Sequence, residues 1–252
     1  MISRKAEEEI VDPFTVAPFS AMDLVIHGAG AALNLGALIP ALAWLAANLS
    51  LLRAGWFWAA LAVAAGAYVA DFVTGFLHWS FDTWFGEDWP AIRRMVLLVR
   101  EHHIHPERIF RYSFWHDAGM LSWFAFLASA PVFAWVLLRG GPARPIDAAM
   151  VLGAAVASLE IVFMLEFHKF GHRLQRPLFV RALQGLHLLL SPTQHLRHHS
   201  GPHDSNYCLI TGDFDRTAGR LGAWRLLERV ISAVTGWTPR ENDRAWFRRY
   251  GR

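Results

Sequence analysis

The sequence predicts an all-α integral membrane protein with about four transmembrane helices and a cytoplasmic, histidine-rich helical cap. Three observations support this fold class. Hydrophobic residues make up 54% of the 252 residues, and the mean hydropathy is +0.25. Four apolar stretches are long enough to cross a bilayer core of about 30 Å. Twelve of the 13 histidines lie at the ends of these stretches or outside them.

The apolar stretches alternate with polar segments, as expected for a multi-pass protein. A soluble core could contain one such stretch, but four in succession, joined by short Arg-bearing links, favour membrane spans. Few charged residues interrupt them: Asp71 lies near the end of the second, and Glu160 and Glu166 lie in the fourth. We expect spans at about residues 24–49, 56–78, 120–138 and 148–167.

The placement of Lys and Arg predicts the orientation. Four crossings put the N-terminus, residues 79–119 and residues 168–252 on one side, and these segments contain 21 of the 24 Lys and Arg. Because positively charged segments remain in the cytoplasm, we expect this side to be cytoplasmic. The chain then divides into an N-terminal cytoplasmic segment, residues 1–22, and a single membrane domain, residues 23–252.

Charge and cysteine content exclude several classes of site and partner. The isoelectric point near 9.4 is explained by a basic membrane-facing surface that attracts anionic lipid head groups, so no nucleic-acid partner is required. A single cysteine, Cys208, excludes an internal disulfide framework and a cysteine-ligated zinc site.

Histidine spacing identifies the candidate site. His168 and His172 are four residues apart, which places both rings on one helix face. His195, His198 and His199 have the spacing HxxHH, again suited to one helix face, and Glu101-His-His forms a third group. Asp71, Gly75, His78 and Asp82 recur at helical spacing and would form a polar stripe leaving the membrane, where ionisable groups are functional candidates.

These groups supply enough imidazoles for two metal ions. Neutral imidazole is a ligand for iron, zinc, copper and nickel. A histidine-rich, cysteine-free site at a membrane surface fits oxygen-activating iron best, because two irons can share the electrons needed to reduce O2 and attack an unactivated C–H bond. The eight candidate ligands are His78, His102, His103, His168, His172, His195, His198 and His199.

Neighbouring polar residues are candidates for supporting roles. Carboxylates often accept the second ring N–H of a ligating histidine, and this role is open to Asp71, Asp82, Glu101 and Glu166. An ordinary polar residue at a helix end is the alternative for each. Roles beside the ligands and purely structural roles remain equally open for three more histidines, His116, His187 and His203.

The segment from Leu178 to Leu190 is the candidate interfacial helix. Arg181, Gln184 and His187 recur every third residue, with Leu and Phe between them, as in a helix that lies in the membrane plane. It would guide a lipid toward the metal face or anchor the chain. For Tyr207, packing is favoured over a contact with substrate.

Four segments resemble the lipid desaturases, the family of plasmanylethanolamine desaturases and a plant plastid phosphatidylglycerol palmitate desaturase. They read DFVTGFLHWSFDTW from Asp71, REHHIHP from Arg100, HKFGH from His168 and LLLSPTQHLRHHSGPHDSNYCLITG from Leu188. A weaker match, GWTPR, begins at Gly236. The resemblance covers residues 60–240, and HxxHHxxPHxxxYC is its most specific part.

The resemblance implies a multi-pass enzyme with two iron ions, using O2 and an electron donor such as a cytochrome b5-like or ferredoxin-like protein. The family's histidine pattern falls on the same eight residues, and its aspartate after the HW motif falls on Asp82. Most motifs are similar to the plasmanyl type, which forms vinyl ethers. They include the Pro-His pair that ends at His203, and His187 also fits this type. Gln194-His195 is similar to the plant type, which forms a trans double bond in an acyl chain.

Several departures from the family concern the substrate. His105 stands where plasmanyl enzymes carry aspartate, and His116 and Ala118 replace an acidic residue and an asparagine in the segment from Tyr112 to Gly119. The substrate expected is a membrane phospholipid, most simply an ether phospholipid. The candidate substrate contacts are His105, Tyr112, His116, His187 and Tyr207.

Two further functions remain open from the sequence. A lipid hydroxylase would use the same ligands, because both reactions begin with hydrogen abstraction. A zinc- or haem-binding regulator or transporter is the non-enzymatic alternative, although transporters place their ligands near the bilayer midplane.

Overall fold

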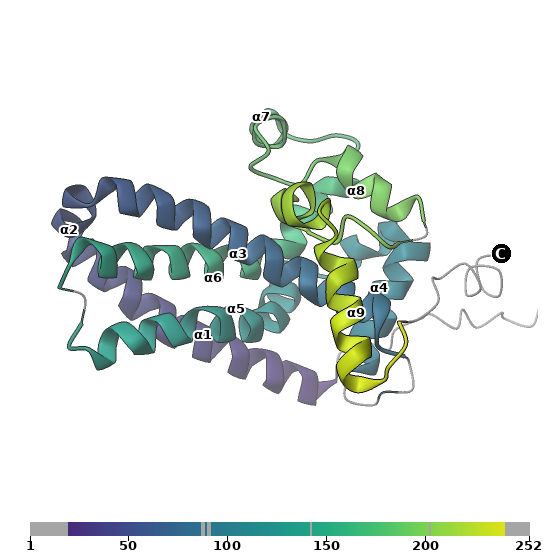
Figure 1. Ribbon diagram of the computed structural model, residues 1–252. Coiled ribbons are helices and arrows are strands. Elements are labelled where there is room, and N and C mark those ends of the chain that lie inside the picture. Colours follow the sequence, from purple (N-terminus) through teal and green to yellow (C-terminus); the bar gives the residue numbers. More distant parts are fainter. Residues whose placement is uncertain (1–19, 87–88, 90–91, 142, 202, 240–252) are drawn as a thin grey trace, which may run out of the picture.

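The computed structural model describes residues 20–86, 89, 92–141, 143–201 and 203–239, and the regular elements in them are all helical. Four long helices lie roughly side by side, and shorter helices gather at one end (Figure 1). The long helices are α1 (Ala21–Ala47), α3 (Trp56–Thr83), α5 (Phe114–Leu138) and α6 (Pro145–His172). The shorter ones are α2 (Leu49–Ala54), α4 (Arg93–Ile104), η1 (Pro106–Arg111), α7 (Leu178–Gly185), α8 (Pro192–His199), η2 (Asp215–Gly219) and α9 (Ala223–Thr235).

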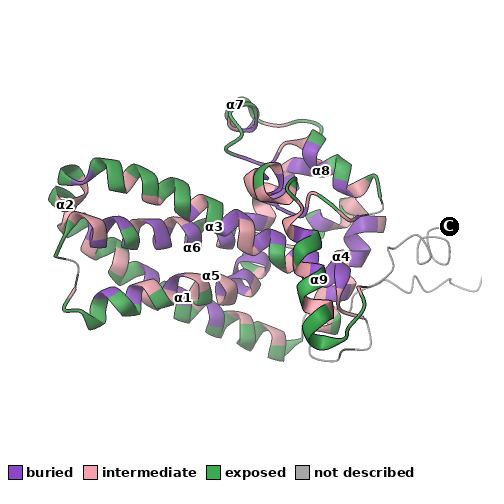
Figure 2. Ribbon diagram, viewed as in Figure 1, coloured by how far each residue is buried: buried purple, intermediate pink, exposed green. Residues whose placement is uncertain are grey.

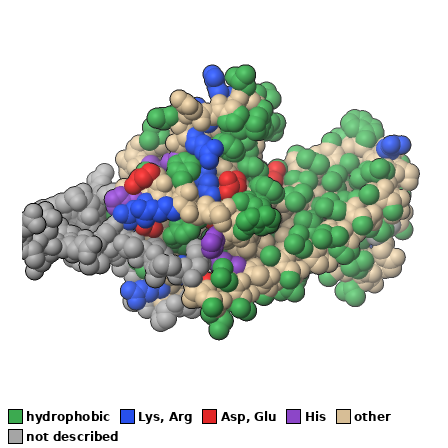
Figure 3. Space-filling model, turned by 180° about the vertical axis from the view of Figure 1, so that it is seen from behind, with side chains coloured by type: hydrophobic (Ala, Val, Ile, Leu, Met, Phe, Trp, Pro, Cys, Tyr) green, Lys and Arg blue, Asp and Glu red, His purple; other side chains and the backbone are tan. Residues whose placement is uncertain are grey.

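The four long helices confirm the four predicted spans, since each is long and apolar enough to cross a bilayer. Their outward faces are apolar: Leu24, Phe57, Leu61 and Leu127 are among the exposed side chains. On the face drawn in Figure 3, hydrophobic side chains cover most of the bundle. Most charged side chains gather instead at the end where the shorter helices lie. The predicted multi-pass membrane protein is therefore confirmed.

Helix α6 is the centre of the bundle and packs against α3, α5 and α1. Of its most apolar 18-residue window, 56% is buried, compared with 22–33% for the other three long helices, and Figure 2 shows the difference along the ribbons. Gly66 of α3 and Gly153 of α6 allow the two backbones to approach. A Cβ at Gly153 would lie 2.8 Å from the Ala62 carbonyl oxygen. Small residues at such crossings are typical of membrane helices.

Helices α3, α5 and α6 continue beyond the predicted apolar stretches. Helix α3 ends at Thr83 instead of His78, α5 starts at Phe114 instead of Met120, and α6 ends at His172 instead of Phe167. Hydropathy detects only the part of a helix that suits lipid. The added turns carry polar residues that are buried against the cap, and these turns bring some of the predicted ligands out of the membrane span.

Helix α7 is shorter than predicted and has a different orientation about its axis. It ends at Gly185, and His187 has a φ of +60°, which stops a right-handed helix. Gln184 is buried and its Nε2 donates to the Leu190 carbonyl at 2.9 Å. Leu178 and Phe179 instead are exposed. Figure 1 shows α7 end-on while the four long helices lie across the picture, so it runs nearly perpendicular to the bundle, as an interfacial helix would.

The predicted N-terminal segment, residues 1–22, lies almost entirely outside the described residues, as does the end of the tail from residue 240. The division into one segment and one domain and the cytoplasmic location of the cap stay predictions.

Candidate metal centre

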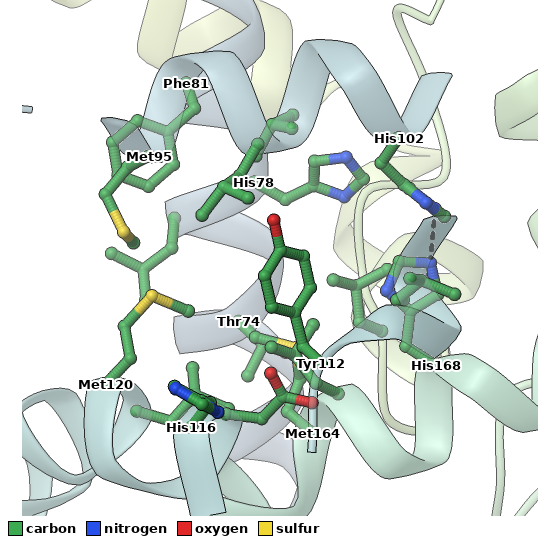
Figure 4. Close-up of a pocket in the computed structure, with 18 of the residues that line it drawn as sticks. Thr74, His78, Phe81, Met95, His102, Tyr112, His116, Met120, Met164 and His168 are labelled. Carbon is green, nitrogen blue, oxygen red and sulfur yellow. Dashed lines mark hydrogen bonds between the residues drawn. The ribbon is translucent and has the colours of Figure 1, made fainter. Parts of the chain in front are cut away.

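All eight predicted histidines meet where the bundle joins the cap. They form two groups in which the nearest ligand atoms all lie within 4.8 Å of one another. Site A consists of His102, His168, His172, His195 and His199, and site B of His78, Asp82, His103 and His198. Figure 4 shows His78, His102 and His168 from three different helices facing one space.

Site A has the geometry of a metal-binding site. Nε2 of His168 lies 2.8 Å from Nε2 of His195, and His102 Nε2 lies 3.0 Å from both His168 Nε2 and His172 Nε2. Nitrogen ligands about 2.1 Å from an ion and at right angles to one another would be about 3.0 Å apart. Five converging ring nitrogens with no carboxylate among them therefore fit one transition-metal ion.

Site B is similar but includes a carboxylate. Nε2 of His103 lies 3.0 Å from Nε2 of His198 and 3.4 Å from Nε2 of His78. Asp82 Oδ2 lies 3.4 Å from His78 Nε2. The side chains of Asp82 and the three histidines are nearly inaccessible to solvent. Asp82 was predicted as a supporting residue, and the geometry makes it a candidate ligand.

Helix geometry divides the ligands between the two sites. On α8, His195 and His199 are one turn apart and point into site A, whereas His198 points into site B. On α4, the adjacent His102 and His103 enter different sites, because neighbouring side chains on a helix point about 100° apart. The HxxHH string was expected to present one face, and instead it connects two sites.

The local sequence explains how α8 is held. Ser191 caps its N-terminus by accepting a hydrogen bond from the Gln194 backbone N–H at 3.2 Å, and Pro192 occupies the first turn. On α4, Pro106 follows the last residues and ends the helix just after its two histidines.

Backbone carbonyls orient two of the rings in site B. His78 Nδ1 donates to the Tyr207 carbonyl at 3.0 Å, and His198 Nδ1 donates to the Ser205 carbonyl at 2.8 Å. Each Nε2 is then left with its lone pair directed at the site, which is the tautomer that a metal requires. Residue-type patterns cannot find such partners, because every residue has a carbonyl.

Burial keeps the rings neutral. Desolvation, together with the neighbouring imidazoles, holds the pKa of His102, His103, His195 and His198 well below the ordinary value of 6.5. The same causes lower the pKa of His199 to about 3. Neutral imidazole is the form that binds metal, so the sites need not release protons from these rings at neutral pH.

Three predicted supporting carboxylates have other partners. Asp71 accepts backbone N–H groups of Thr211, Gly212 and Phe214 at 2.9–3.0 Å, so it fixes the loop that follows α8. Hydropathy and spacing had indicated a contact with His78, but a charged group this deep is stabilised by several donors at once.

Glu101 and Glu166 form ion pairs. Glu101 Oε1 lies 2.7 Å from Arg108 Nη1. Glu166 Oε1 lies 2.7 Å from Lys169 Nζ, which also contacts Asp117 Oδ2 at 2.7 Å. The structure places these carboxylates beside cations instead of ring N–H groups. The sequence patterns did not point to Lys169 or Asp117. The available signal was the position of Lys169 between His168 and His172 on one helix.

His203 lies against site B. Its ring stacks on that of His103, with centroids 4.3 Å apart and planes 8° apart. It is buried and has a φ of +60°, a conformation that costs free energy in a residue other than glycine. The supporting role of His203 stays a prediction, and the stacking places its ring beside a candidate ligand of site B.

An apolar cavity of about 130 Å³ adjoins both sites. It is lined by His78 of site B, by His102 and His168 of site A, and otherwise mainly by hydrophobic side chains. Tyr112 extends into it toward the imidazoles, and Met95, Met120 and Met164 surround it (Figure 4). The sequence did not indicate these methionines, because a cavity depends on how separate helices pack.

The predicted substrate contacts divide into two groups. Tyr112 and His116 line the cavity. His105 instead faces Glu107, with its Nδ1 3.5 Å from Oε1, and His187 lines a separate polar pocket. Tyr207 is buried, with its ring centroid 6.0 Å from that of His78 and 5.4 Å from that of Trp224. The latter three do not line the cavity.

Comparison with known proteins gives a consistent result. Residues 67–242 match the lipid desaturase domain. The chain is 34% identical to mouse plasmanylethanolamine desaturase 1 over 74% of this chain and 69% of the relative. It is also 34% identical to plasmanylethanolamine desaturase of Myxococcus xanthus, over 72% of this chain and 63% of the relative.

The chloroplastic fatty acid desaturase 4 of Arabidopsis thaliana is 30% identical over 72% of this chain and 54% of the relative. The chain thus spans between about half and two thirds of the length of these curated relatives. No solved structure matches it. The extent of the domain match and the mouse relative together show that this chain belongs to the lipid desaturase family.

Proposed function

We propose that this chain is an O2-dependent di-iron desaturase that forms the vinyl ether double bond of a plasmalogen, as the name plasmanylethanolamine desaturase implies for its relatives. Sites A and B would hold one iron each through their eight histidines and Asp82. The expected electron donor is a cytochrome b5-like or ferredoxin-like protein, and the metal end of the bundle is expected to face the cytoplasm.

The bound irons would supply the capacity to reduce O2 to two waters with two electrons and two protons from outside and two hydrogens from the substrate. Two adjacent CH2 groups of the sn-1 alkyl chain would thereby become CH=CH. The chain's own residues bind and orient the lipid. Hydrophobic side chains of the cavity, such as Phe81, Leu98 and Met164, exclude water from the reacting carbons.

One observation carries the proposal: a single apolar cavity touches ligands of both sites. A hydrocarbon chain in this cavity would lie beside both irons, and apolar lining favours such a chain over a soluble substrate. The cavity wall also carries polar side chains, namely His116 and the ion pair between Arg108 and Glu101. These side chains suit the glycerol end of a lipid. A double bond at the first two alkyl carbons requires that polar end to lie close to the metals.

Lipid analysis tests the proposal. The chain is expressed in a host that lacks vinyl ethers and is fed an alkylglycerol, with the His198→Ala variant as the control. We expect ethanolamine phospholipids two mass units lighter than their alkyl precursors, with the acid lability of a vinyl ether, and none from the variant. Fed lipid that stays unchanged, although the protein contains iron and reductant is supplied, would exclude this activity.

The plastid relative supports a second candidate, acyl-chain desaturation, and the same experiment separates the two. Acid-stable loss of two hydrogens from a fatty acyl chain would assign the acyl substrate. Gain of one oxygen would instead indicate a hydroxylase with the same metal sites.

A further inference from the structure

A second cavity lies on the face of α8 opposite the metal ligands. It has a volume of about 380 Å³ and, unlike the substrate cavity, is polar. Thr193, Gln194 and Arg197 of α8 form one wall, and Arg216 and Arg220 form another, in and beside η2. His187 completes the rim. None of these residues contributes a ligand to site A or B.

The cavity carries excess positive charge. Of its three arginines, Arg216 is paired with Asp213 and also donates to the Gln194 side chain and the Thr211 carbonyl, at 2.6 Å and 3.0 Å. Arg197 and Arg220 are exposed and form no ion pair within the described residues. The carboxylate in the lining, Asp215, is buried and accepts from the Trp224 indole N–H at 2.8 Å. The two free guanidinium groups therefore suit a phosphate.

Three residues of the cavity, His187, Arg197 and Arg220, each have a strongly exposed leucine next to them in the chain. Leu186 and Leu188 flank His187 and are 68% and 57% exposed. Leu196 precedes Arg197 and is 64% exposed, and Leu221 follows Arg220 and is 91% exposed. Leucine beside arginine on a surface is typical of a membrane interface, where apolar side chains enter the acyl region and cations meet head groups.

The position of α7 supports the same environment. This helix precedes His187, runs nearly perpendicular to the long helices (Figure 1), and exposes Leu178 and Phe179. An interfacial helix in this orientation would set the cavity at the depth of the lipid phosphates. A soluble anion would not account for the exposed leucines that adjoin three of the lining residues in the chain.

We propose that the cavity between His187, Arg197 and Arg220 binds the phosphate of an anionic phospholipid, at a site separate from the substrate cavity. The lipid bound there is not oxidised, because the cavity lies on the face of α8 opposite the three histidines that this helix contributes to sites A and B. Its phosphate is held by Arg197 and Arg220, and its acyl chains lie along the exposed leucines. This lipid fixes the cap, and with it α8, against the membrane surface.

Native mass spectrometry of the detergent-purified chain tests the site. The protein is titrated with phosphatidylglycerol and with phosphatidylcholine, and the first bound lipid is quantified. The double variant Arg197→Gln/Arg220→Gln removes the two free guanidinium groups. A matched control, Arg181→Gln/Arg229→Gln, removes two exposed arginines of the cap that do not line the cavity. Metal content and melting temperature establish that each variant is folded.

We expect one phosphatidylglycerol to bind tightly to the wild type and to the control, and about 30-fold more weakly to the double variant, from the usual effect of two arginines at an anionic surface. Phosphatidylcholine should show no such dependence. Equal weakening in the control would assign binding to diffuse charge and overturn the proposal.

Two further arms identify the source of the anion. Inorganic phosphate at millimolar concentration should leave the bound lipid in place, and its displacement would assign the site to a soluble phosphate. The double variant could instead bind lipid normally and show a higher KM for the electron donor. In that case the arginines of the cavity dock an acidic protein, and the lipid proposal is wrong.

Discussion

Asp82 and Asp71 lie on one helix, three turns apart, and have different partners. Asp82 faces three imidazoles of site B, whereas Asp71 accepts three backbone N–H groups. Because an amide is a poor ligand for iron, Asp82→Asn should lower the iron content from about two to about one per chain. Elemental analysis of purified protein measures this, and an unchanged iron content would remove Asp82 from site B.

Asp71→Asn is the matched substitution and should affect stability instead. Hydrogen bonds to a charged acceptor contribute about 1.5–3 kcal/mol each, and an amide oxygen replaces only part of this. We expect a clearly lower melting temperature with iron content near that of the wild type. A variant that loses iron but keeps its melting temperature would place Asp71 among the metal-supporting residues.

The buried rings predict how pH affects the metal-free protein. Their pKa values are lowered on folding, to about 3 for His199, so the unfolded state binds more protons below pH 6.5. Stability is therefore fully present above pH 6.5 and is lost as pH falls from there toward the folded-state values. Melting temperatures between pH 8 and pH 5 should fall on acidification, and less so in His195→Gln. A melting temperature that rises as pH falls would contradict this.

At the scale of elements, α4 provides a direct test of the cavity. Leu97 and Leu98 are adjacent and both half-buried, but only Leu98 lines the cavity. Leu98→Trp should fill the space, reduce turnover at least tenfold and leave iron content unchanged. Leu97→Trp is the control. If both variants turn over lipid equally well, the hydrocarbon chain binds elsewhere.

The crossing of α3 and α6 provides a second test. Gly66 faces the Gly153 carbonyl so closely that any side chain there requires the helices to separate. A Cβ added at Gly36 of α1, by contrast, would have no neighbour within 4 Å. Gly66→Leu should therefore lower the melting temperature and the yield of folded protein, and Gly36→Leu should not. Equal melting temperatures for the two variants would exclude a tight crossing.

Periodicity and hydropathy were sufficient for the four spans and for the eight histidines that the structure brings together, because both depend on residue type and spacing within one helix. They did not show that His198 and His199 enter different sites, since this depends on where α8 lies relative to α3 and α6. They also assigned Glu166 and Asp71 to histidines, because a pattern does not reveal the competing partners, Lys169 and the loop amides, that folding brings close.

At the scale of the whole molecule, the polar site lies where the apolar bundle ends. Candidate ligands on α3 and α6 lie where these helices leave the membrane span, and α4 and α8 cover them from the cap. A lipid can thus keep its hydrocarbon in the bundle while its polar end stays near the interface. This arrangement explains why a membrane enzyme carries its buried imidazoles at one end of its helices instead of at mid-membrane.

The metal content of the purified chain tests the central claim most directly. Protein produced with iron in the medium is analysed for metals, and its iron environment is measured by X-ray absorption. We expect about two irons per chain, ligated mainly by nitrogen, with loss of iron in His198→Ala and not in His105→Ala, whose ring lies outside both sites. One iron or none per chain, or tightly bound zinc in both sites, would contradict the claim that the eight histidines and Asp82 hold a pair of irons.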